Sequence, residues 1–510
     1  MLEHICPSAR EFVKGDDMSY VRKYLQKVPA ESQTAAVIAY LASIDAVKEA
    51  FPAIGQSIVQ ELRDQRTHIK LIASENFSSL PVQLAMGNLL TDKYSEGYPG
   101  HRFYAGCENV DAVESLAVEW AKKVFGADHA YVQPHSGADA NLVAFWAIIV
   151  QRVQSREVEA LGKKSVDELT SEEYEKVRKI LLSQKMMGLA LGSGGHLTHG
   201  FRHNISAKMM QSVSYEVDPE TGLIDYDALR EQMLREKPLI LVAGYSAYPR
   251  LIDFAKMREI ADEVDAVLLV DMAHFAGLVA GRAMTGVYNP VPYAHVVTTT
   301  THKTLRGPRG GMVLCKEEFK EAVNKGCPLV LGGPLPHVMA AKALAFKEAA
   351  SPEFSRYAHH IVDNARAFAD ALMQKGVRIL TGGTDNHLFV ADVASTFQLT
   401  GRQAETLLRG ARFTVNRNSI PKDKNGAWYT SGIRIGTPAV TTLGMKTEEM
   451  KEMASIIYDL LKEARPEVVE KTGLPSKSLA AVPEPVMHRA QRRVAEILER
   501  FPLYPELVID

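Results

Sequence analysis

Short apolar runs alternate with amphipathic segments through the middle of the chain. The runs are rich in β-branched and aliphatic residues, so each predicts a buried strand; they cover residues 130–132, 189–191, 239–243, 266–270 and 296–301. Residues 112–124 and 255–264 instead place apolar side chains at helical spacing. The order strand, helix, strand from about residue 125 to residue 315 predicts a doubly wound α/β sheet.

Two flanking regions have a different pattern. Residues 338–375 form a long helical stretch, and shorter strands and helices follow at 389–393, 401–409, 413–415, 432–435, 445–463 and 485–501. The alanine-rich residues 35–51 also predict a helix. We therefore predict an N-terminal helical arm over residues 1–66, a large α/β domain over 67–345 and a smaller C-terminal α+β domain over 346–510.

Residues 151–187 interrupt the α/β pattern with a segment much richer in charge than the 24% of the whole chain. Residues 170–173 have the sequence of a capping box, which predicts a helix start. One apolar stripe follows, made of Tyr174, Val177, Ile180 and Leu181. We predict a helical hairpin inserted into the large domain, docked on the body by this stripe and remote from the ligand end of the sheet.

Composition narrows the classes of function. The 510 residues carry a formal net charge of −2 and are 46% hydrophobic, so charge gives no argument for binding nucleic acid or a membrane surface. The four cysteines lack the spacing of a disulfide framework or a metal site. The apolar run 142–150 is far shorter than a membrane helix requires, and the first residues do not resemble a secretory signal. We predict a cytoplasmic protein that binds neither nucleic acid nor membrane.

The main candidate for chemistry is a lysine that follows the strand 296–301. Lys303 lies just after this strand, and Asp271 closes the strand before it. Ligands of open α/β sheets bind at the carboxyl ends of the strands, so both side chains are expected at one edge. A lysine amine forms a Schiff base with an aldehyde, and an acid holds the proton of a pyridine nitrogen. The pair predicts a pyridoxal phosphate site, whereas a solvated surface lysine is the simpler alternative for Lys303 alone.

Two glycine-rich segments add candidates for cofactor binding. The turn Ser136–Gly137–Ala138 precedes a predicted helix, where free backbone N–H groups bind an anion. His196 and His199 are three residues apart, but no cysteine or carboxylate near them in sequence completes a metal site. We therefore expect no metal, and we interpret His196 as an imidazole that stacks on an aromatic cofactor ring.

Two further segments carry candidates for substrate binding and proton transfer. Arg434 lies on the predicted strand 432–435, where its guanidinium could bind a substrate carboxylate or form a structural ion pair. The loop 94–107 is dense in glycine and tyrosine, and it contains Glu96. A carboxyl among aromatic rings can have a raised pKa and act as an acid or base, although an exposed glutamate is the commoner case.

Seven motifs together carry a resemblance to a known family. They are LIASEN (71–76), YSEGYPG (94–100), HSGADAN (135–141), GGHLTHG (194–200), DMAH (271–274), VVTTTTHKTLRGPRGG (296–311) and SGIRIGTPA (431–439). From about residue 68 to residue 505, apart from the insertion, the chain resembles serine hydroxymethyltransferase. The resemblance implies a fold-type-I transferase dependent on pyridoxal 5'-phosphate, with a mixed, seven-stranded type of sheet. It also implies reversible conversion of L-serine and tetrahydrofolate to glycine and 5,10-methylenetetrahydrofolate, through an aldimine on Lys303.

The same resemblance assigns roles to individual residues. The catalytic residues would be Lys303, Glu96, His196, Asp271, His274, His302 and Tyr104. The cofactor would be bound by Ser136, Gly137, Ala138, His196, Ser246, Asp271, His274, Lys303 and Tyr94. The amino-acid substrate would be bound by Ser74, Arg434, Glu96 and Tyr104, and the tetrahydrofolate co-substrate by Leu191, Gly195, His196, Leu197, Asn418, Gly426, Ala427 and Trp428. Because Glu96, Tyr94 and Tyr104 would come from a neighbouring subunit, the resemblance implies a homodimer or homotetramer with shared active sites.

The chain departs from the family pattern at several positions. Ala138 stands in place of a second serine, and Asp139 stands where Gln or Pro is common. Leu329 and Val330 are interpreted as replacing a glycine pair that contributes to the neighbour's phosphate site, and residues 426–428 replace a Ser-Pro-Phe type of segment. Fewer donors and an added acid predict that the cofactor phosphate is held more loosely than in relatives with two serines.

Two other functions remain open from the sequence. A folate-independent aldolase or an amino-acid racemase would need the same lysine and ring, because the cofactor weakens every bond to the α-carbon and geometry selects one. A non-catalytic relative that binds pyridoxal phosphate is the second alternative, and the presence of Lys303, Asp271, His196, Glu96 and Arg434 argues against it. Visible spectra recorded with glycine, with and without tetrahydrofolate, would discriminate between these functions.

Overall fold

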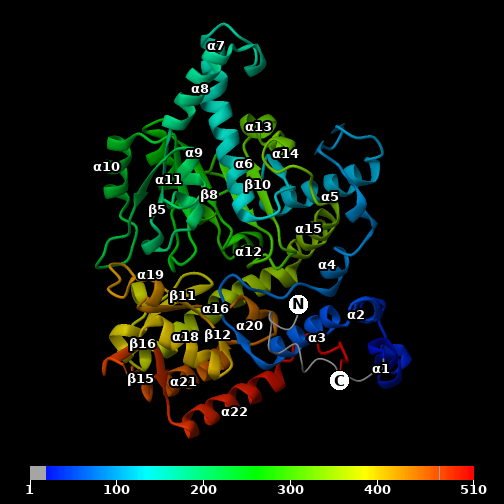
Figure 1. The fold of residues 1–510 in the computed structure, drawn as a ribbon, viewed down its shortest axis with the longest axis vertical. Helices are drawn as coiled ribbons and strands as arrows, with labels where there is room; N and C mark the ends of the chain where they lie inside the picture. The colour runs from blue at the N-terminus through cyan, green and yellow to red at the C-terminus, as the bar shows by residue number, and fades with distance from the viewer. Residues whose placement is uncertain (1–18, 470, 510) are drawn as a thin grey trace.

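The protein has a large lobe and a smaller lobe stacked along its longest axis (Figure 1). The computed structural model describes residues 19–469 and 471–509. The large lobe contains a seven-stranded sheet, and the smaller lobe, drawn in yellow to red, contains a three-stranded sheet with helices around it. The part of the predicted N-terminal arm before residue 19 lies outside the described residues.

The sheet of the large lobe is mixed and nearly all parallel. Its strand order is β4-β10-β9-β8-β7-β5-β6. β10 runs antiparallel to both of its neighbours, and the strands from β9 to β6 run parallel to one another. The bounds are β4 His129–Tyr131, β5 Lys185–Leu189, β6 Gln211–Tyr215, β7 Ile240–Gly244, β8 Val267–Asp271, β9 Val296–Thr300 and β10 Gly311–Cys315. This sheet confirms the predicted doubly wound fold class.

Both faces of the sheet are buried, which explains why its strands are apolar throughout. Along β8, Leu268 and Val270 pack into one hydrophobic cluster, whereas Val267 and Leu269 pack into another. Successive side chains of a strand point to opposite faces, so the two clusters lie on the two sides of the sheet. The helices of the first side include α5 Glu108–Phe125, α10 Tyr226–Glu236, α11 Phe254–Asp262, α12 Ala276–Ala280 and α15 Pro336–Ala349, and those of the second include α6 Gly137–Ile149 and α13 Lys320–Asn324.

The smaller lobe has its own core. Strands β11 Leu388–Asp392, β14 Gly432–Gly436 and β13 Asn416–Asn418 form an antiparallel sheet in that order. Helices α18 Gly401–Gly410, α21 Thr447–Lys462 and α22 Glu484–Arg500 pack against it. α16 Pro352–Gln374 serves both lobes, because Phe354 packs in the core of the large lobe and Phe368 in that of the smaller one. The predicted domain boundary at residue 345 remains a prediction.

Shorter elements complete the chain. Helices α1 Tyr20–Lys27, α2 Ala35–Ala50 and α3 Pro52–Thr67 pack together with Leu503 and Leu507 near the C-terminal end. Strand β1 Ile69–Lys70 pairs with β12 Phe413–Thr414, β2 Gly97–Tyr98 with β3 His101–Arg102, and β15 Arg465–Val468 with β16 Pro475–Ala481. The remaining α-helices are α4 Leu80–Leu84, α9 Ser206–Met209, α14 Gly326–Leu329, α17 Val393–Phe397, α19 Gly426–Tyr429 and α20 Pro438–Thr442. None of the described helices is long and apolar enough to cross a membrane.

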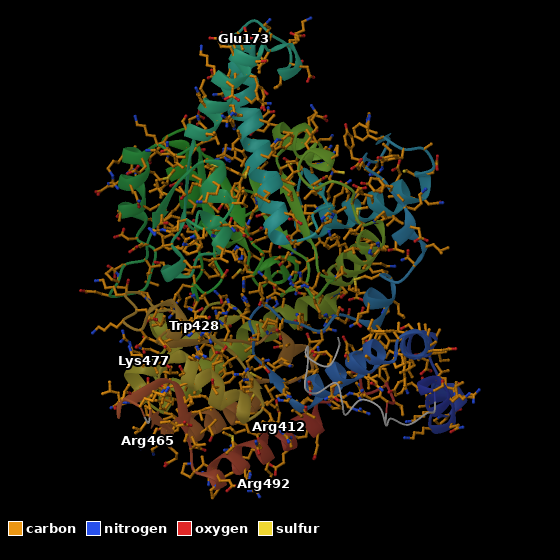
Figure 2. The ribbon with its side chains drawn as sticks, in the orientation of Figure 1. Glu173, Arg412, Trp428, Arg465, Lys477 and Arg492 are labelled. Carbon is orange, nitrogen blue, oxygen red and sulfur yellow. The ribbon has the colours of Figure 1, made fainter. Side chains whose placement is uncertain are left out.

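The predicted insertion forms a helical hairpin that projects from the large lobe (Figure 1). α6 continues through a π-helical turn, Val150–Gln154, into α7 Ser155–Ala160, and α8 Ser171–Ser183 returns after the capping box at Thr170. The insertion ends three residues earlier than predicted, because residues 185–187 already belong to β5. Figure 2 labels Glu173, which lies near the far tip of the hairpin.

The predicted docking of this hairpin through one apolar stripe is wrong in part. Tyr174, which the prediction placed on the body, is 47% exposed, while Val177 is 3% exposed. Leu181, nearer the base of the hairpin, packs against the core of the large lobe. Only the end of the stripe nearest the large lobe is therefore buried, because the outer turns of the hairpin extend beyond that lobe.

Candidate active site

The two central candidates lie at the ends of neighbouring parallel strands. β8 ends at Asp271, which pairs in register with Thr298 of β9, and Lys303 follows β9 by three residues. The adjacent antiparallel strand β10 begins at Gly311, beside the end of β9. The structure therefore brings the predicted lysine and carboxylate to the same edge of the sheet, as parallel pairing requires.

Asp271 is buried and fully hydrogen-bonded at this edge. One carboxylate oxygen accepts from Asn141 Nδ2 at 2.9 Å and lies 3.1 Å from His199 Nε2, and the other accepts from Ala273 N at 3.0 Å. Burial alone would raise the pKa of Asp271, but the hydrogen bond and charge of His199, with Asn141, hold that pKa well below its usual value. Asp271 therefore remains a carboxylate, the form that can hold a proton on a pyridine nitrogen.

A second group of atoms fixes His196 beside this carboxylate. Asn141 Nδ2 also donates to Thr198 Oγ1 at 2.8 Å, and Thr198 Oγ1 lies 2.8 Å from His196 Nδ1. Thr298 Oγ1 in turn donates to Asn141 Oδ1 at 2.6 Å. Burial lowers the pKa of His196 to about 4, so its imidazole is neutral at physiological pH. A neutral, oriented ring is suited to the predicted stacking on a flat cofactor.

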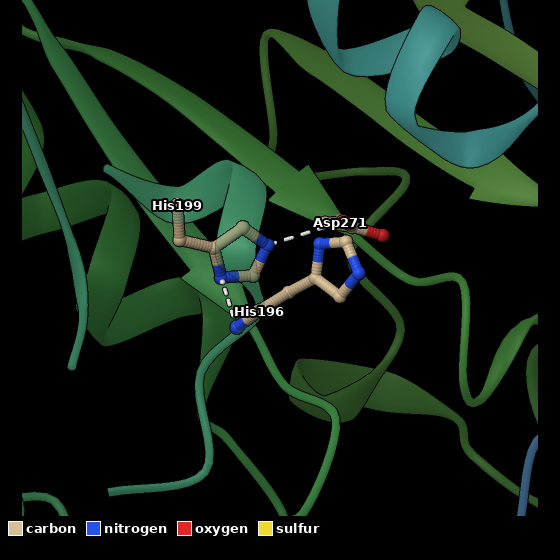
Figure 3. A group of neighbouring side chains, drawn as sticks. All are labelled: His196, His199 and Asp271. Atoms are coloured by element: carbon tan, nitrogen blue, oxygen red, sulfur yellow. Dashed lines mark hydrogen bonds and ion pairs between the residues drawn. The ribbon is translucent and has the colours of Figure 1, made fainter. Parts of the chain in front are cut away.

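His196, His199 and Asp271 together resemble a metal-ligand cluster (Figure 3). Their ligand atoms all lie within 4.8 Å of one another. The sequence showed no carboxylate near the two histidines, and that premise is wrong because the fold brings Asp271 beside them. However, hydrogen bonds already use His199 Nε2, His196 Nδ1 and both carboxylate oxygens. The cluster is therefore explained as a hydrogen-bonded support for Asp271.

Lys303 has the properties of a reactive amine. Burial, together with the charges of Arg434 and Arg309, outweighs the opposing charge of Asp271 and lowers the pKa of Lys303 to about 8. Its Nζ makes no hydrogen bond within the described part of the chain, whereas its backbone carbonyl accepts from Asn76 Nδ2 at 2.9 Å. The amine is thus deprotonated far more readily than an ordinary lysine, which a nucleophile requires.

Two of the predicted histidines lie close to this lysine. His274 Nδ1 is 3.2 Å from His387 Nε2 of the smaller lobe, and burial with the charge of Lys303 holds the pKa of His274 well below 6.5. Burial also lowers the pKa of His302 to about 3, and His302 Nδ1 has no hydrogen-bond partner among the described residues. Both imidazoles are neutral, so they can orient groups by hydrogen bonding without adding charge.

The predicted anion-binding turn lies at the start of α6. Ser136 caps this 13-residue helix, and its Oγ accepts from Asp139 N at 3.1 Å. Gly137 lies directly against Thr300 of β9, and a side chain there would collide with the threonine methyl group. Because the start of α6 lies against the end of β9, its first turn remains the predicted site for the phosphate of a group attached to Lys303.

Ala138 and Asp139 lie in the first turn of α6, directly after Ser136 and Gly137. Ala138 is exposed, and a carboxylate oxygen of Asp139 lies 3.7 Å from His135 Nδ1. Leu329 is exposed, and the pair Gly332–Gly333 begins three residues after it, with Gly332 at φ +73°. Looser binding of a phosphate remains a prediction that is based on Ala138, Asp139 and the Leu329–Val330 pair.

Arg434 is the predicted carboxylate-binding residue, and it has no acidic partner among the described residues. Its Nε donates to Asn416 Oδ1 at 3.1 Å and its Nη1 to the carbonyl of Ser246 at 2.6 Å. Burial lowers the pKa of Arg434 to about 10, which still leaves the guanidinium charged. The alternative of a structural ion pair is thus wrong for the described chain, and a half-buried cation without a counter-ion favours an anionic ligand.

Ser74 and Ser246 lie beside the strand that carries Arg434. The segment before Ser74 runs along β14, where Gly436 N donates to Leu71 O at 2.8 Å and Gly436 abuts Ala73. Ser246 N donates to Gly194 O at 2.7 Å, which ties the strand end after β7 to the segment that holds His196. Ser74 and Arg434, two of the four predicted substrate residues, therefore lie near the predicted cofactor residue Ser246, where the two lobes meet.

Glu96, Tyr94 and Tyr104 form a separate group, away from Lys303. Tyr104 OH donates to Glu96 Oε2 at 3.2 Å, and the rings of Tyr94 and Tyr104 pack edge to face at 5.2 Å. Both rings are largely exposed, and the loop lies at the outer edge of the large lobe (Figure 1). Arg102 holds this loop by donating to the carbonyls of Ser95 and Gly97. No hydrogen bond or ion pair joins this group to Lys303 within the described chain.

The predicted folate residues border the seam between the lobes. A cavity of about 250 Å³ is lined there by residues 192–194, 247–249, 378–382 and 418–421, and it includes Asn418. Leu191 and Leu197 are both largely exposed near it, while Gly195 packs tightly against the backbone after β5. Trp428, in the helix Gly426–Tyr429 that also holds Ala427, is 62% exposed and is flanked by Arg402 and Arg417 (Figure 2).

Several residues of the site were missed by sequence reasoning. Asn141, Thr198 and Thr298 orient Asp271 and His196, and Asn76 fixes the backbone at Lys303. Asn141 and Thr198 do lie inside motifs singled out for their glycines: Asn141 is three residues after the predicted Ala138, and Thr198 directly follows the predicted Leu197. A polar residue facing the core on the first turn of an apolar helix is the signal that would have identified Asn141.

The donor set fits pyridoxal phosphate. It combines a lysine amine of lowered pKa, a carboxylate held ionised, a neutral imidazole and a helix start beside the same strand. Each group matches one part of the cofactor. The lysine amine matches its aldehyde, the carboxylate its ring nitrogen, the imidazole its ring face and the helix start its phosphate. The unpaired Arg434 adds a place for the carboxylate of an amino acid.

Comparison with known proteins agrees with this geometry. The sequence profile described as Serine hydroxymethyltransferase matches residues 47–161 and 170–457. A serine hydroxymethyltransferase of Treponema pallidum (strain Nichols) is 59% identical over 489 residues, which cover 96% of this chain and 85% of that protein. Those of Chlamydia trachomatis serovar D and Mycolicibacterium smegmatis are each 53% identical and cover 96% and 94% of this chain, and 99% and 96% of their own lengths. The chain therefore belongs to the serine hydroxymethyltransferase family.

Proposed function

We propose that this protein catalyses the reversible transfer of the hydroxymethyl group of L-serine to tetrahydrofolate, which yields glycine and 5,10-methylenetetrahydrofolate. It is a transferase of one-carbon metabolism that depends on pyridoxal 5'-phosphate, as its family membership supports. The observation that carries the residue assignments is the pairing of an amine of lowered pKa with an ionised carboxylate at the ends of β9 and β8.

The central residues would each act on one part of the reacting system. Lys303 would hold the cofactor through its amine, which is readily deprotonated. Asp271 would hold a proton near the ring nitrogen, and His196 would pack against the ring. When bound, pyridoxal phosphate withdraws electrons from the α-carbon of the attached amino acid. Arg434 binds the substrate carboxylate and so fixes which bond at the α-carbon is aligned for cleavage.

Proton transfer at the serine hydroxyl is assigned to Glu96, with Tyr104 as its hydrogen-bonded neighbour. The half-buried Glu96 and the exposed Tyr104 lie on the same outer loop, which supports their contribution to the site of a second copy, so we propose a homo-oligomer with shared active sites. His274 and His302, both neutral, would orient groups near Lys303. Leu191, Leu197, Asn418 and Trp428 would contact the folate at the seam between the lobes.

A cytoplasmic location is part of the proposal. The three cysteines of the described chain, Cys107, Cys315 and Cys327, are all unpaired, which is typical of proteins in a reducing compartment. The small-molecule reaction requires no nucleic acid or membrane partner.

The experiment that tests the function uses the purified protein loaded with pyridoxal phosphate. Serine cleavage is measured with and without tetrahydrofolate, and the lysine that carries the cofactor is identified by borohydride reduction and peptide mapping. We expect cleavage that depends on tetrahydrofolate and labelling of Lys303. Equal cleavage of a β-hydroxy amino acid without tetrahydrofolate would favour a folate-independent aldolase, and labelling of another lysine would refute the assignment.

A further inference from the structure

Lys342 is a buried lysine that the reaction does not use. It lies on α15 and is 1% exposed, and no carboxylate pairs with it in the described part of the chain. Its Nζ donates instead to three backbone carbonyls, those of Val132 at 2.6 Å, Pro134 at 2.9 Å and Gly311 at 2.9 Å. Only the ammonium form has three N–H donors for three acceptors, so this contact requires the charged side chain.

Two of these carbonyls belong to the segment that leads into the anion-binding turn. Val132 and Pro134 lie between β4 and Ser136, the cap of α6. Pro134 O accepts a second hydrogen bond from Gly311 N at 2.8 Å. The ammonium of Lys342 therefore fixes the backbone at Pro134, two residues before Ser136.

The third carbonyl belongs to the segment that returns from Lys303. Gly311 lies so close to Ser136 that any side chain on it would collide with the Ser136 carbonyl. A side chain on Gly310 would lie 2.5 Å from Lys342 Cε and 3.1 Å from Thr301 Oγ1. Gly310 O also accepts from Thr301 N at 3.1 Å, two residues before Lys303. The methylene groups and ammonium of Lys342 thus fill the space beneath both the turn and the Lys303 segment.

Burying a cation without a counter-ion is costly, and an apolar side chain of similar length would avoid the cost. Burial lowers the pKa of Lys342 to about 7, while the charges of Glu114 and Asp139 oppose this change. The three carbonyl acceptors favour the ammonium form, because the neutral amine has only two N–H donors. A positive charge directly behind an anion-binding turn would favour binding of an anion there, because it adds to the positive electrostatic potential at the N-terminus of α6.

We propose that Lys342 is a positioning residue of the cofactor site, whose ammonium ties the phosphate-binding turn to the Lys303 segment and favours binding of a phosphate there. This inference rests on the proposed function, since it assumes that the turn at Ser136 holds the phosphate of pyridoxal phosphate. It differs from a purely structural role in one respect: the loss of Lys342 should weaken binding of the phosphorylated cofactor more than binding of pyridoxal, which lacks the phosphate.

The test compares apo-protein variants in equilibrium titrations with pyridoxal phosphate and with pyridoxal. Lys342→Met keeps most of the side-chain volume and removes the charge, and Lys347→Met, an exposed lysine on the same helix, is the matched control. For Lys342→Met we expect the Kd for pyridoxal phosphate to rise by about tenfold or more and the Kd for pyridoxal to change less than about threefold. For Lys347→Met both constants should match the wild type.

A second variant covers the case in which Lys342→Met does not fold. Lys342→Gln is neutral but can still donate to two of the three carbonyls, and we expect the same selective loss of phosphate affinity, to a smaller extent. An unchanged Kd for pyridoxal phosphate, or an equal loss for both ligands, in a variant with native circular dichroism would overturn the role of Lys342. If the wild-type protein itself failed to prefer pyridoxal phosphate over pyridoxal, the proposed cofactor site would be refuted instead.

Discussion

The group around Lys303 and the group around Glu96 differ in burial and in hydrogen bonding. Asp271 and His196 are enclosed, and every polar atom that orients them comes from the same chain. Glu96 and Tyr104 contact each other near the surface, and the neighbouring Tyr94 is 60% exposed. Both groups are predicted for one active site, but no hydrogen bond or ion pair joins them within the described chain.

This difference suggests how the site is built. The group at Lys303 depends on the sheet, because the ends of β8 and β9 fix its spacing. The Glu96 loop is instead held by Arg102, which bonds to the carbonyls on either side of Glu96 and pairs with Asp111 and Glu114. A loop that is both rigid and outward-facing is preorganised for contact with another molecule. The proposed shared active site follows from this contrast.

The largest effect should come from Lys303→Ala, which removes the reactive amine from the enclosed group. We expect no covalent attachment of the cofactor and no measurable turnover. The matched control is Lys316→Ala, because Lys316 follows the antiparallel β10 and so lies at the opposite edge of the sheet. Mass spectrometry after borohydride reduction measures attachment. Substantial turnover by Lys303→Ala would break the assignment of the enclosed group as the reactive centre.

Asp271→Asn should have the next largest effect. A neutral amide does not hold the proton on the ring nitrogen, so we expect turnover to fall on the order of 100-fold or more while the fold is retained. Asp265→Asn is the control, since Asp265 is exposed and its left-handed backbone (φ +56°) suits asparagine. Steady-state kinetics check this prediction, and near-wild-type turnover by Asp271→Asn would contradict the role of the carboxylate.

The lowered pKa of Lys303 predicts the pH dependence of cofactor attachment. Only the neutral amine attacks an aldehyde, and with a pKa of about 8 its neutral fraction rises about tenfold between pH 7 and pH 9 and then levels off. Stopped-flow measurement of attachment to apo-protein should show this midpoint. A rate that kept rising to pH 10 would mean that Lys303 titrates like an exposed lysine and that the contrast in burial has no chemical effect.

The smallest effect should come from shortening the projecting hairpin. Replacing residues 159–176 with a short Gly/Ser linker keeps Val158 and Val177, which are buried. We expect cofactor binding and serine cleavage to change less than about twofold, because no residue of either polar group lies in this segment. If the deletion abolished activity while oligomeric state and cofactor binding stayed intact, the hairpin would have to be a third part of the site.

The parts of the fold that sequence reasoning predicted share a local signal. The β-branched run before Lys303 and the aliphatic run before Asp271 are buried on both faces, so their composition reports their structure directly. The hairpin of β15 and β16 was not predicted, because its side chains are largely exposed. Its sequence does not show the clear alternation of apolar and polar residues that identifies a strand. Tyr174 was misplaced for a related reason: helical spacing identifies a face but not how far the body beneath it extends.

The chemically active residues of the candidate site could be predicted from the sequence, but the hydrogen bonds that orient them could not. Lys303, Asp271 and Arg434 are chemically distinctive at the ends of strands, so motif and position identified them together. The link from Thr298 through Asn141 to Asp271 joins residues more than 100 positions apart, and only the packing of α6 on the sheet brings them together. The same applies to Lys342, whose three carbonyl partners have no side-chain signature in the sequence.

A mixed oligomer tests the central claim, that Glu96 serves the site of another copy. Lys303→Ala and Glu96→Gln chains, each inactive alone in the tetrahydrofolate-dependent reaction, are co-expressed with different tags, and the mixed species is purified. If the sites are shared, each mixed dimer contains one site with both Lys303 and Glu96 intact, and it should show about half of the wild-type turnover per dimer. If Glu96 acts within its own chain, every site in the mixed dimer lacks one residue, and a mixed species as inactive as its parents would contradict the account.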